Sequence, residues 1–153
     1  MSCDTCRLVA RRDAGEAPPW DQIVRTPLYD VVHAYNTSLP GWLVIVLRRH
    51  AAALDELTED EAAALGHLVR ATSVALKTVT GCAKTYIMQF AEADGHNHVH
   101  VHVVPRHALL PAEARGANIF RYLGITDDTR LEDDAMNEVA GQLQVVLDDL
   151  LEG

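Results

Sequence analysis

A row of histidines is the part of the sequence best suited to chemistry. Five of the eight histidines lie between positions 96 and 107, and three of them, His98, His100 and His102, alternate with valine. Side chains alternate across a β-strand, so a strand here puts the three imidazoles on one face and the valines on the other. At about 3.3 Å per residue, neighbouring imidazoles then stand roughly 6.6 Å apart. A polar strand face that is merely rich in histidine is the structural alternative.

Such a row supports two kinds of chemistry. Three imidazoles could serve one catalytic metal ion, although residues on one strand face diverge too little to surround a tetrahedral ion, so at most two would be ligands. Alternatively, one imidazole attacks phosphorus as a nucleophile while its neighbours bind phosphate oxygens. An imidazole pKa of about 6.5 leaves the ring largely neutral, and so nucleophilic, at pH 7.

The elements that must position this row can be located from periodicity and turn residues. Alternation predicts strands over residues 28–35, 41–49, 84–92 and 98–105, arranged as two hairpins. Helical spacing predicts helices over about 58–80, with a capping box at Thr58 and Glu61, and over about 131–151. We expect a loop over 13–20 and irregular chain over 106–127, with a short helical turn at 111–115. The fold class is therefore α+β, with an antiparallel sheet of about five strands and two main helices.

Composition restricts the domain organisation and the partners. The 153 residues are 48% apolar and predict a single domain over 1–153, in which 107–153 forms a C-terminal extension with one helix. The formal charge of −9 and the lack of a basic stripe argue against binding a nucleic acid polymer. The sequence has no signal-peptide pattern, and its longest dense apolar run, WLVIVL, is too short to cross a bilayer. We therefore expect a cytoplasmic protein without membrane contacts, whose Cys3 and Cys6 are thiols or metal ligands.

Several segments together resemble a known family. The His-x-His-x-His motif, followed by two apolar residues and Pro105-Arg106, resembles the signature of the histidine-triad (HIT) nucleotide hydrolases and transferases. LPGWLVIVLRRH (39–50), LTEDEAAALGHL (57–68) and YIMQFAEADG (86–95) are similar to that family's Pro-Gly strand, following helix and pre-triad strand. The resemblance extends over about residues 28–106 and implies a HIT-like fold.

The resemblance implies roles for individual residues. His100 would be the nucleophile, His102 would donate a hydrogen bond to a phosphate oxygen, and His98 would complete the catalytic triad. Substrate contacts would come from Gln89, Asn36 and Arg106.

Two positions depart from the family pattern. Trp42 stands where several members carry a histidine, and Ala34 stands where a ribose-binding Asp or Asn is expected. These departures leave the identity of the substrate open.

A second site is implied at the amino terminus. In one branch of the family a Cys-x-x-Cys pair is completed by two histidines, which here correspond to Cys3, Cys6, His50 and His98. A closed Cys2His2 set would hold a structural zinc that staples residues 1–20, and the covalent mechanism would need no catalytic metal. The alternative is a loosely ordered tail with His50 as a surface histidine.

The expected function is hydrolysis at the α-phosphorus of a nucleoside phosphoramidate or dinucleoside polyphosphate, through a nucleotidyl-histidine. A nucleotidyl transferase, a non-catalytic nucleotide-binding regulatory module and a metal-dependent hydrolase remain alternatives. Apart from the structural zinc, the expected ligand is a small nucleotide. Small residues on the helix over 58–80 and apolar side chains on both faces of 84–92 predict a homodimer.

Overall fold

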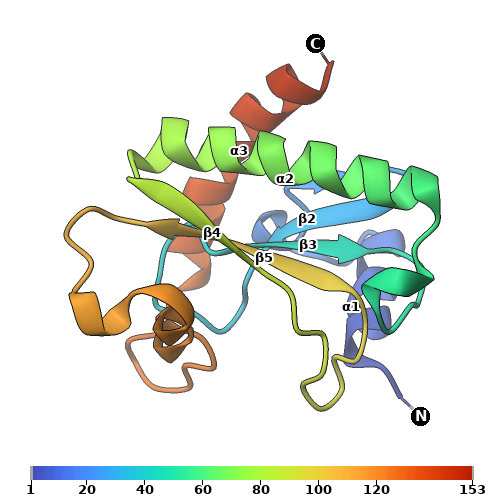
Figure 1. Ribbon diagram of the computed structural model, residues 1–153, viewed down its shortest axis with the longest axis horizontal. Helices are drawn as coiled ribbons and strands as arrows, with labels where there is room; N and C mark the ends of the chain where they lie inside the picture. Colours follow the sequence, from blue (N-terminus) through green and yellow to red (C-terminus); the bar gives the residue numbers. More distant parts are fainter. Residues whose placement is uncertain (1, 153) are drawn as a thin grey trace.

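The centre of the fold is a five-stranded antiparallel sheet in the order β1-β2-β3-β5-β4 (Figure 1). The computed structural model describes residues 2–152, so Met1 and Gly153 lie outside the described residues. The strands are β1 (Val24–Arg25), β2 (Tyr29–His33), β3 (Leu43–Leu47), β4 (Lys84–Met88) and β5 (His100–Arg106), and the α-helices are α1 (Asp4–Asp13), α2 (Glu59–Thr80) and α3 (Asp133–Glu152). The α+β class and both hairpins are confirmed.

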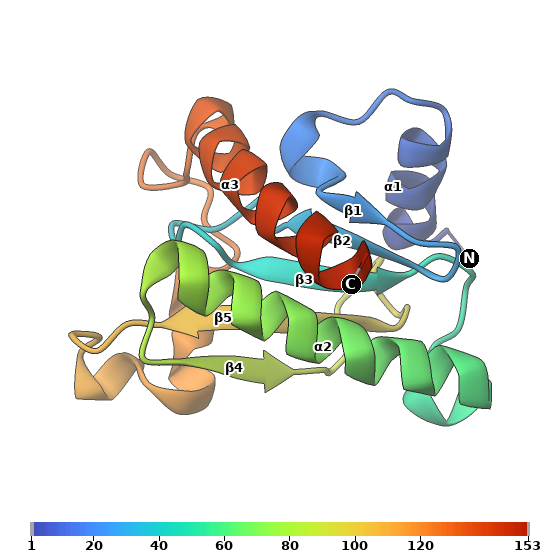
Figure 2. The same cartoon turned by 90° about the horizontal axis from the view of Figure 1, so that it is seen from above.

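Helices α2 and α3 cover one face of the sheet, as Figure 2 shows from above. Helix α2 begins at the predicted capping box, in which the Thr58 side chain accepts from Glu61 N–H and the Glu61 carboxylate accepts from Thr58 N–H. It ends at Gly81, whose φ of 70° suits a residue without a Cβ. The core on this face contains the valines that alternate with the histidines, Val99, Val101 and Val103. The predicted valine face is therefore confirmed.

The opposite face of the sheet carries a second apolar cluster, built on valines of β2, β3 and β5 around the buried Trp42. Helix α1 lies against this face at one end, and residues 112–122 lie against it at the other (Figure 1). The latter segment forms two 3-10 helices, Ala112–Ala114 and Gly116–Tyr122. Only the first of them was expected from the sequence.

Several boundaries differ from the sequence-based expectation. The strand expected over 84–92 ends at Met88, and the strand expected over 98–105 begins at His100. Helix α1 and the two-residue strand β1 were not predicted at all. The single-domain organisation stays a prediction, as does the cytoplasmic location. No helix within residues 2–152 has the length and apolar character needed to cross a membrane.

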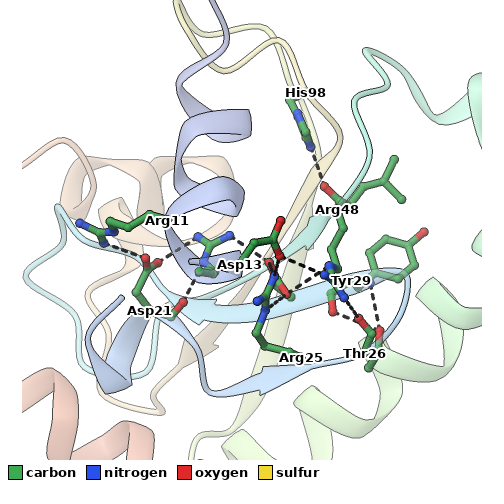
Figure 3. Close-up of polar contacts among 11 residues, drawn as sticks. Arg11, Asp13, Asp21, Arg25, Thr26, Tyr29, Arg48 and His98 are labelled. Atoms are coloured by element: carbon green, nitrogen blue, oxygen red, sulfur yellow. Dashed lines mark hydrogen bonds and ion pairs between the residues drawn. The ribbon is translucent and has the colours of Figure 1, made fainter. Parts of the chain in front are cut away.

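Helix α1 is held to the sheet by buried ion pairs rather than by an apolar stripe (Figure 3). Arg12 is 3% exposed and donates from Nη2 to Asp21 at 2.9 Å and from Nη1 to Asp30 at 3.2 Å. Asp21 also accepts from Arg11 at 2.8 Å, and Asp30 accepts from Arg25 Nε at 2.7 Å. Asp21 therefore faces two guanidinium groups, and Asp30 faces three, because Arg48 Nε also lies 4.0 Å from Asp30 Oδ1.

This network predicts a large effect of Arg12 on stability. Arg12→Met should lower the free energy of unfolding by about 3 kcal/mol, the low end for breaking a buried pair, because Arg11 and Arg25 still face the two carboxylates. Arg7→Met on the same helix is the matched control, since the Arg7 side chain is 65% exposed and its ion pair within residues 2–152 is with Asp4, which is itself partly exposed. Arg7→Met should lower the free energy of unfolding by less than about 1 kcal/mol. Urea denaturation measures both, and equal losses would contradict this account.

Candidate active site and metal cluster

A cavity of about 430 Å³ lies on the sheet face opposite α2 and α3. Its floor consists of Val32, Val44 and Val46 from β2 and β3, together with His100 and His102 from β5. Its walls come from α1, from the loop after β4 and from the 3-10 helix Gly116–Tyr122, through Thr5, Leu8, Phe90, His96 and Phe120. A mostly apolar cavity that contains some polar groups is the usual form of a small-molecule site.

The tautomer of His100 is fixed by the backbone. Its Nδ1 lies 2.7 Å from the carbonyl oxygen of His98, and because a carbonyl only accepts, Nδ1 must carry the proton. The neutral ring therefore keeps an unprotonated Nε2. Burial lowers the pKa of His100, which favours this neutral form, and the bond to His98 opposes the shift only in part. The geometry thus supplies a nucleophilic nitrogen in the cavity.

His102 carries the opposite tautomer. Trp42 Nε1–H donates to His102 Nδ1 at 2.9 Å, so the proton of a neutral His102 lies on Nε2. Burial, and secondarily the nearby His100, lowers the pKa of His102 to about 4. The two rings lie 5.2 Å apart between centroids. The cavity therefore contains, side by side, a ring nitrogen with a free lone pair and a ring that can donate.

His98 does not share the cavity with the other two histidines. It precedes the first residue of β5, is fully buried and is absent from the cavity lining. Its Nε2–H donates to the carbonyl oxygen of Leu47 at 2.6 Å, which leaves Nδ1 as the free ring nitrogen. That nitrogen lies 3.5 Å from the sulfurs of both Cys3 and Cys6. The expectation of three imidazoles on one strand face is wrong here, because the chain bends at His98 before the strand begins.

Cys3, Cys6, His50 and His98 form the group of side chains best suited to hold a metal, with one ligand atom of each within 4.8 Å of the others. His50 Nδ1 lies 3.2 Å from His98 Nδ1 and 3.4 Å from Cys6 Sγ. Zinc bonded to nitrogen and sulfur at its usual distances spans edges of roughly 3.3 Å between nitrogens and roughly 3.6 Å between nitrogen and sulfur. The donor set therefore fits tetrahedral zinc in both chemistry and size.

The cysteines also need a cation to become ligands. Burial raises the pKa of Cys6 to about 11, with further contributions from the hydrogen bond and charge of Cys3. A metal ion would supply the positive charge that keeps both sulfurs as thiolates.

His96 is a titratable cavity residue that sequence reasoning did not select. His96 lines the cavity, its Nδ1 lies 2.8 Å from Thr5 Oγ1, and its ring centroid lies 6.4 Å from that of His100. The available signal was its place in the run GHNHVH, but the strand alternation did not extend to it. Thr5 could not be found from sequence, because its contact depends on the unpredicted helix α1.

The three expected substrate-binding residues are not brought together. Asn36 lines the cavity beside Ala34, whereas Gln89 and Arg106 are not among its lining residues. Gln89 follows the end of β4, and Arg106 lies at the far end of β5 from His100. Their roles stay predictions.

The fold and the paired histidines of β5 define a protein of the histidine-triad type. The family model of the HIT domain matches residues 17–109, which is more than half of the chain. The chain therefore belongs to the HIT family. No curated protein matches the sequence.

Solved structures share this fold. A Hit-like protein involved in cell-cycle regulation from Bartonella henselae aligns with a TM-score of 0.67 at 16% identity, over 90% of this chain and 93% of its own. A Zn-bound histidine triad family protein from Mycobacterium smegmatis aligns with a TM-score of 0.67 at 18% identity, over 99% of this chain and 97% of its own. A uridylyltransferase aligns with a TM-score of 0.63 at 21% identity, over 97% of this chain and 46% of its own. At these identities the likeness shows the fold alone.

Proposed function

We propose that the chain is a hydrolase that cleaves nucleoside phosphoramidates or dinucleoside polyphosphates at the α-phosphorus, with His100 as nucleophile. The observation that carries the proposal is the hydrogen bond from His100 Nδ1–H to the His98 carbonyl, which reserves Nε2 for attack. His102 supports it, because its Nε2–H is available to a phosphate oxygen as negative charge develops there. The apolar valine floor suits the nucleoside part of the substrate.

The reaction proceeds in two displacements. His100 Nε2 attacks the α-phosphorus, the bond to the leaving oxygen or nitrogen breaks, and the leaving group departs with the electron pair and takes a proton from solvent. Water then attacks the same phosphorus, the nitrogen–phosphorus bond breaks, and its electron pair returns to Nε2. The water proton passes to solvent and the nucleoside monophosphate leaves. Neither displacement requires a metal ion.

Substitution of His100 tests this mechanism. His100→Asn should reduce turnover of adenosine phosphoramidate or diadenosine polyphosphate at least 10³-fold, because the nucleophile is lost, while AMP binding is retained. His67→Asn on the exposed face of α2 is the matched control and should keep wild-type turnover. Brief reaction with labelled nucleotide followed by alkaline denaturation should leave label on wild-type protein and none on His100→Asn.

Other outcomes of the same experiment would contradict the proposal. More than about one hundredth of wild-type activity in His100→Asn would exclude His100 as nucleophile. Transfer of the label to an added sugar phosphate in preference to water would indicate a transferase. AMP binding without turnover of any of these substrates would indicate a regulatory module, and loss of turnover in chelator with the fold intact would indicate a metal-dependent hydrolase.

We also propose that Cys3, Cys6, His50 and His98 hold one structural zinc ion. The inter-atomic distances support tetrahedral coordination, and the Mycobacterium smegmatis relative of the same fold is described as Zn-bound. Four protein ligands leave no open position for water, so the ion would stabilise the fold without taking part in the reaction. Its contribution would be to fix the start of α1 and the ring of His98.

Metal analysis tests the zinc proposal. Protein purified without chelator should contain about one zinc per chain, and the double variant Cys3→Ser, Cys6→Ser should contain none, because a hydroxyl is a poor ligand for zinc. Cys82→Ser is the matched control: Cys82 is buried outside the cluster, and its loss should leave the zinc content unchanged. Absence of zinc from fresh wild-type protein would refute the proposal.

We further propose that the protein forms a homodimer through β4. This strand is an edge of the sheet, and its Ile87 side chain is 44% exposed. On the opposite face of β4, the 3-10 helix Gly116–Tyr122 covers part of the strand, since Gly116 N–H donates to the Tyr86 hydroxyl. An unpaired edge with exposed apolar side chains favours pairing with a second copy.

Sedimentation at low micromolar concentration tests the dimer. The wild type should have a mass near twice 16.8 kDa. Ile87→Lys should shift it toward the monomer, because a charge would enter the interface. Val145→Lys replaces a side chain of α3, outside the sheet, that is 72% exposed, and this variant should remain a dimer. A stable wild-type monomer would overturn the proposal.

A further inference from the structure

The two tryptophans of the chain differ in what their indole N–H groups do. Both side chains are buried. Trp42 Nε1–H donates to His102 Nδ1 at 2.9 Å, whereas Trp20 Nε1 has no acceptor among residues 2–152. A buried donor or acceptor that loses its hydrogen-bond partner costs free energy of folding. The bond between Trp42 and His102 therefore stabilises this arrangement of the two side chains.

The direction of this bond determines the state of His102. An indole N–H can only donate, so His102 Nδ1 must be an unprotonated acceptor and the proton of the neutral ring lies on Nε2. A protonated imidazolium would place an N–H against the N–H of Trp42, and is therefore disfavoured. With Nδ1 engaged by Trp42, Nε2 is the nitrogen left free for a ligand in the cavity that His102 lines.

The surrounding packing holds both rings in place. Phe120 meets His102 edge-on at 5.3 Å between centroids and meets Trp42 at 5.5 Å. The backbone before Trp42 is also fixed, since Gly41 has a φ of 88° and its N–H donates to His33 Nε2 at 2.9 Å. A Cβ at Gly41 would come within 3.2 Å of Leu76 and would be strained at this φ.

We propose that Trp42 is a positioning residue that holds His102 as the neutral Nε2–H tautomer, with that N–H directed at a phosphate oxygen of the substrate. This inference rests on the proposed function for its consequence in catalysis. The proposed role belongs to the tryptophan of this chain, at a position where several members of the family carry a histidine.

Kinetics of matched tryptophan variants give the first test. Trp42→Phe keeps an aromatic ring but removes the donor, and should lower kcat about tenfold with KM within about twofold. This is less than the 10²–10³-fold loss expected when a donor to the transition state is deleted outright, because His102 is still present. Trp20→Phe removes an equal volume and an N–H without a partner, and should leave kcat within about twofold. Equal losses of kcat in the two variants would overturn the inference.

Nitrogen NMR of the histidine rings gives a test that does not depend on activity. In wild-type protein at pH 7.5, His102 should show a protonated Nε2 and an unprotonated Nδ1, assigned by the signals lost in His102→Gln. In Trp42→Phe the two nitrogens should move toward averaged shifts. A protonated Nδ1 in the wild type, or a His102 spectrum unchanged by Trp42→Phe, would refute the role of Trp42. Failure of the wild type to turn over any nucleotide would refute the proposed function alone, because the spectrum would still report on Trp42 and His102.

Discussion

Two hydrogen bonds at His98 position the functional residues. The ring of His98 donates to the carbonyl oxygen of Leu47, and the carbonyl oxygen of His98 accepts from the ring of His100. The ring bond to Leu47 turns Nδ1 of His98 toward the two cysteines and His50. The carbonyl of His98 accepts from His100 and so determines which nitrogen of His100 is free. One residue therefore connects the group of Cys3, Cys6 and His50 to the proposed nucleophile, and a shift in its backbone would disturb both.

Helix α1 also contacts both the candidate metal site and the cavity. Cys3 caps its first turn and Cys6 lies within it, so a bound zinc would fix the start of the helix. The buried Arg12 fixes its other end through Asp21 and Asp30. Between these two anchors the helix contributes Thr5 and Leu8 to the cavity wall. The ends of α1 thus determine the shape of a site to which it contributes no proposed catalytic group.

Features that depend on local pattern could be predicted from the sequence, and features that depend on distant partners could not. Alternating valines located β5, and the pair Thr58 and Glu61 located the start of α2, because both signals lie within a few residues. Helix α1 was missed because the buried Arg12 is paired with carboxylates that lie 9 and 18 residues further along the chain. His98 was placed on the strand face because alternation cannot reveal a bend. The contact of Trp42 with His102 spans 60 residues and has no local signal.

We propose that His100 Nε2 faces the phosphorus of a bound nucleotide while His102 faces one of its oxygens. A crystal structure of the zinc-loaded protein with AMP tests it most directly. The phosphorus should lie about 3–3.5 Å from His100 Nε2, with an oxygen within hydrogen-bonding distance of His102 Nε2 and the nucleoside over Val32, Val44 and Val46. A phosphate bound away from His100, or coordinated to a metal ion at the histidines of β5, would contradict it.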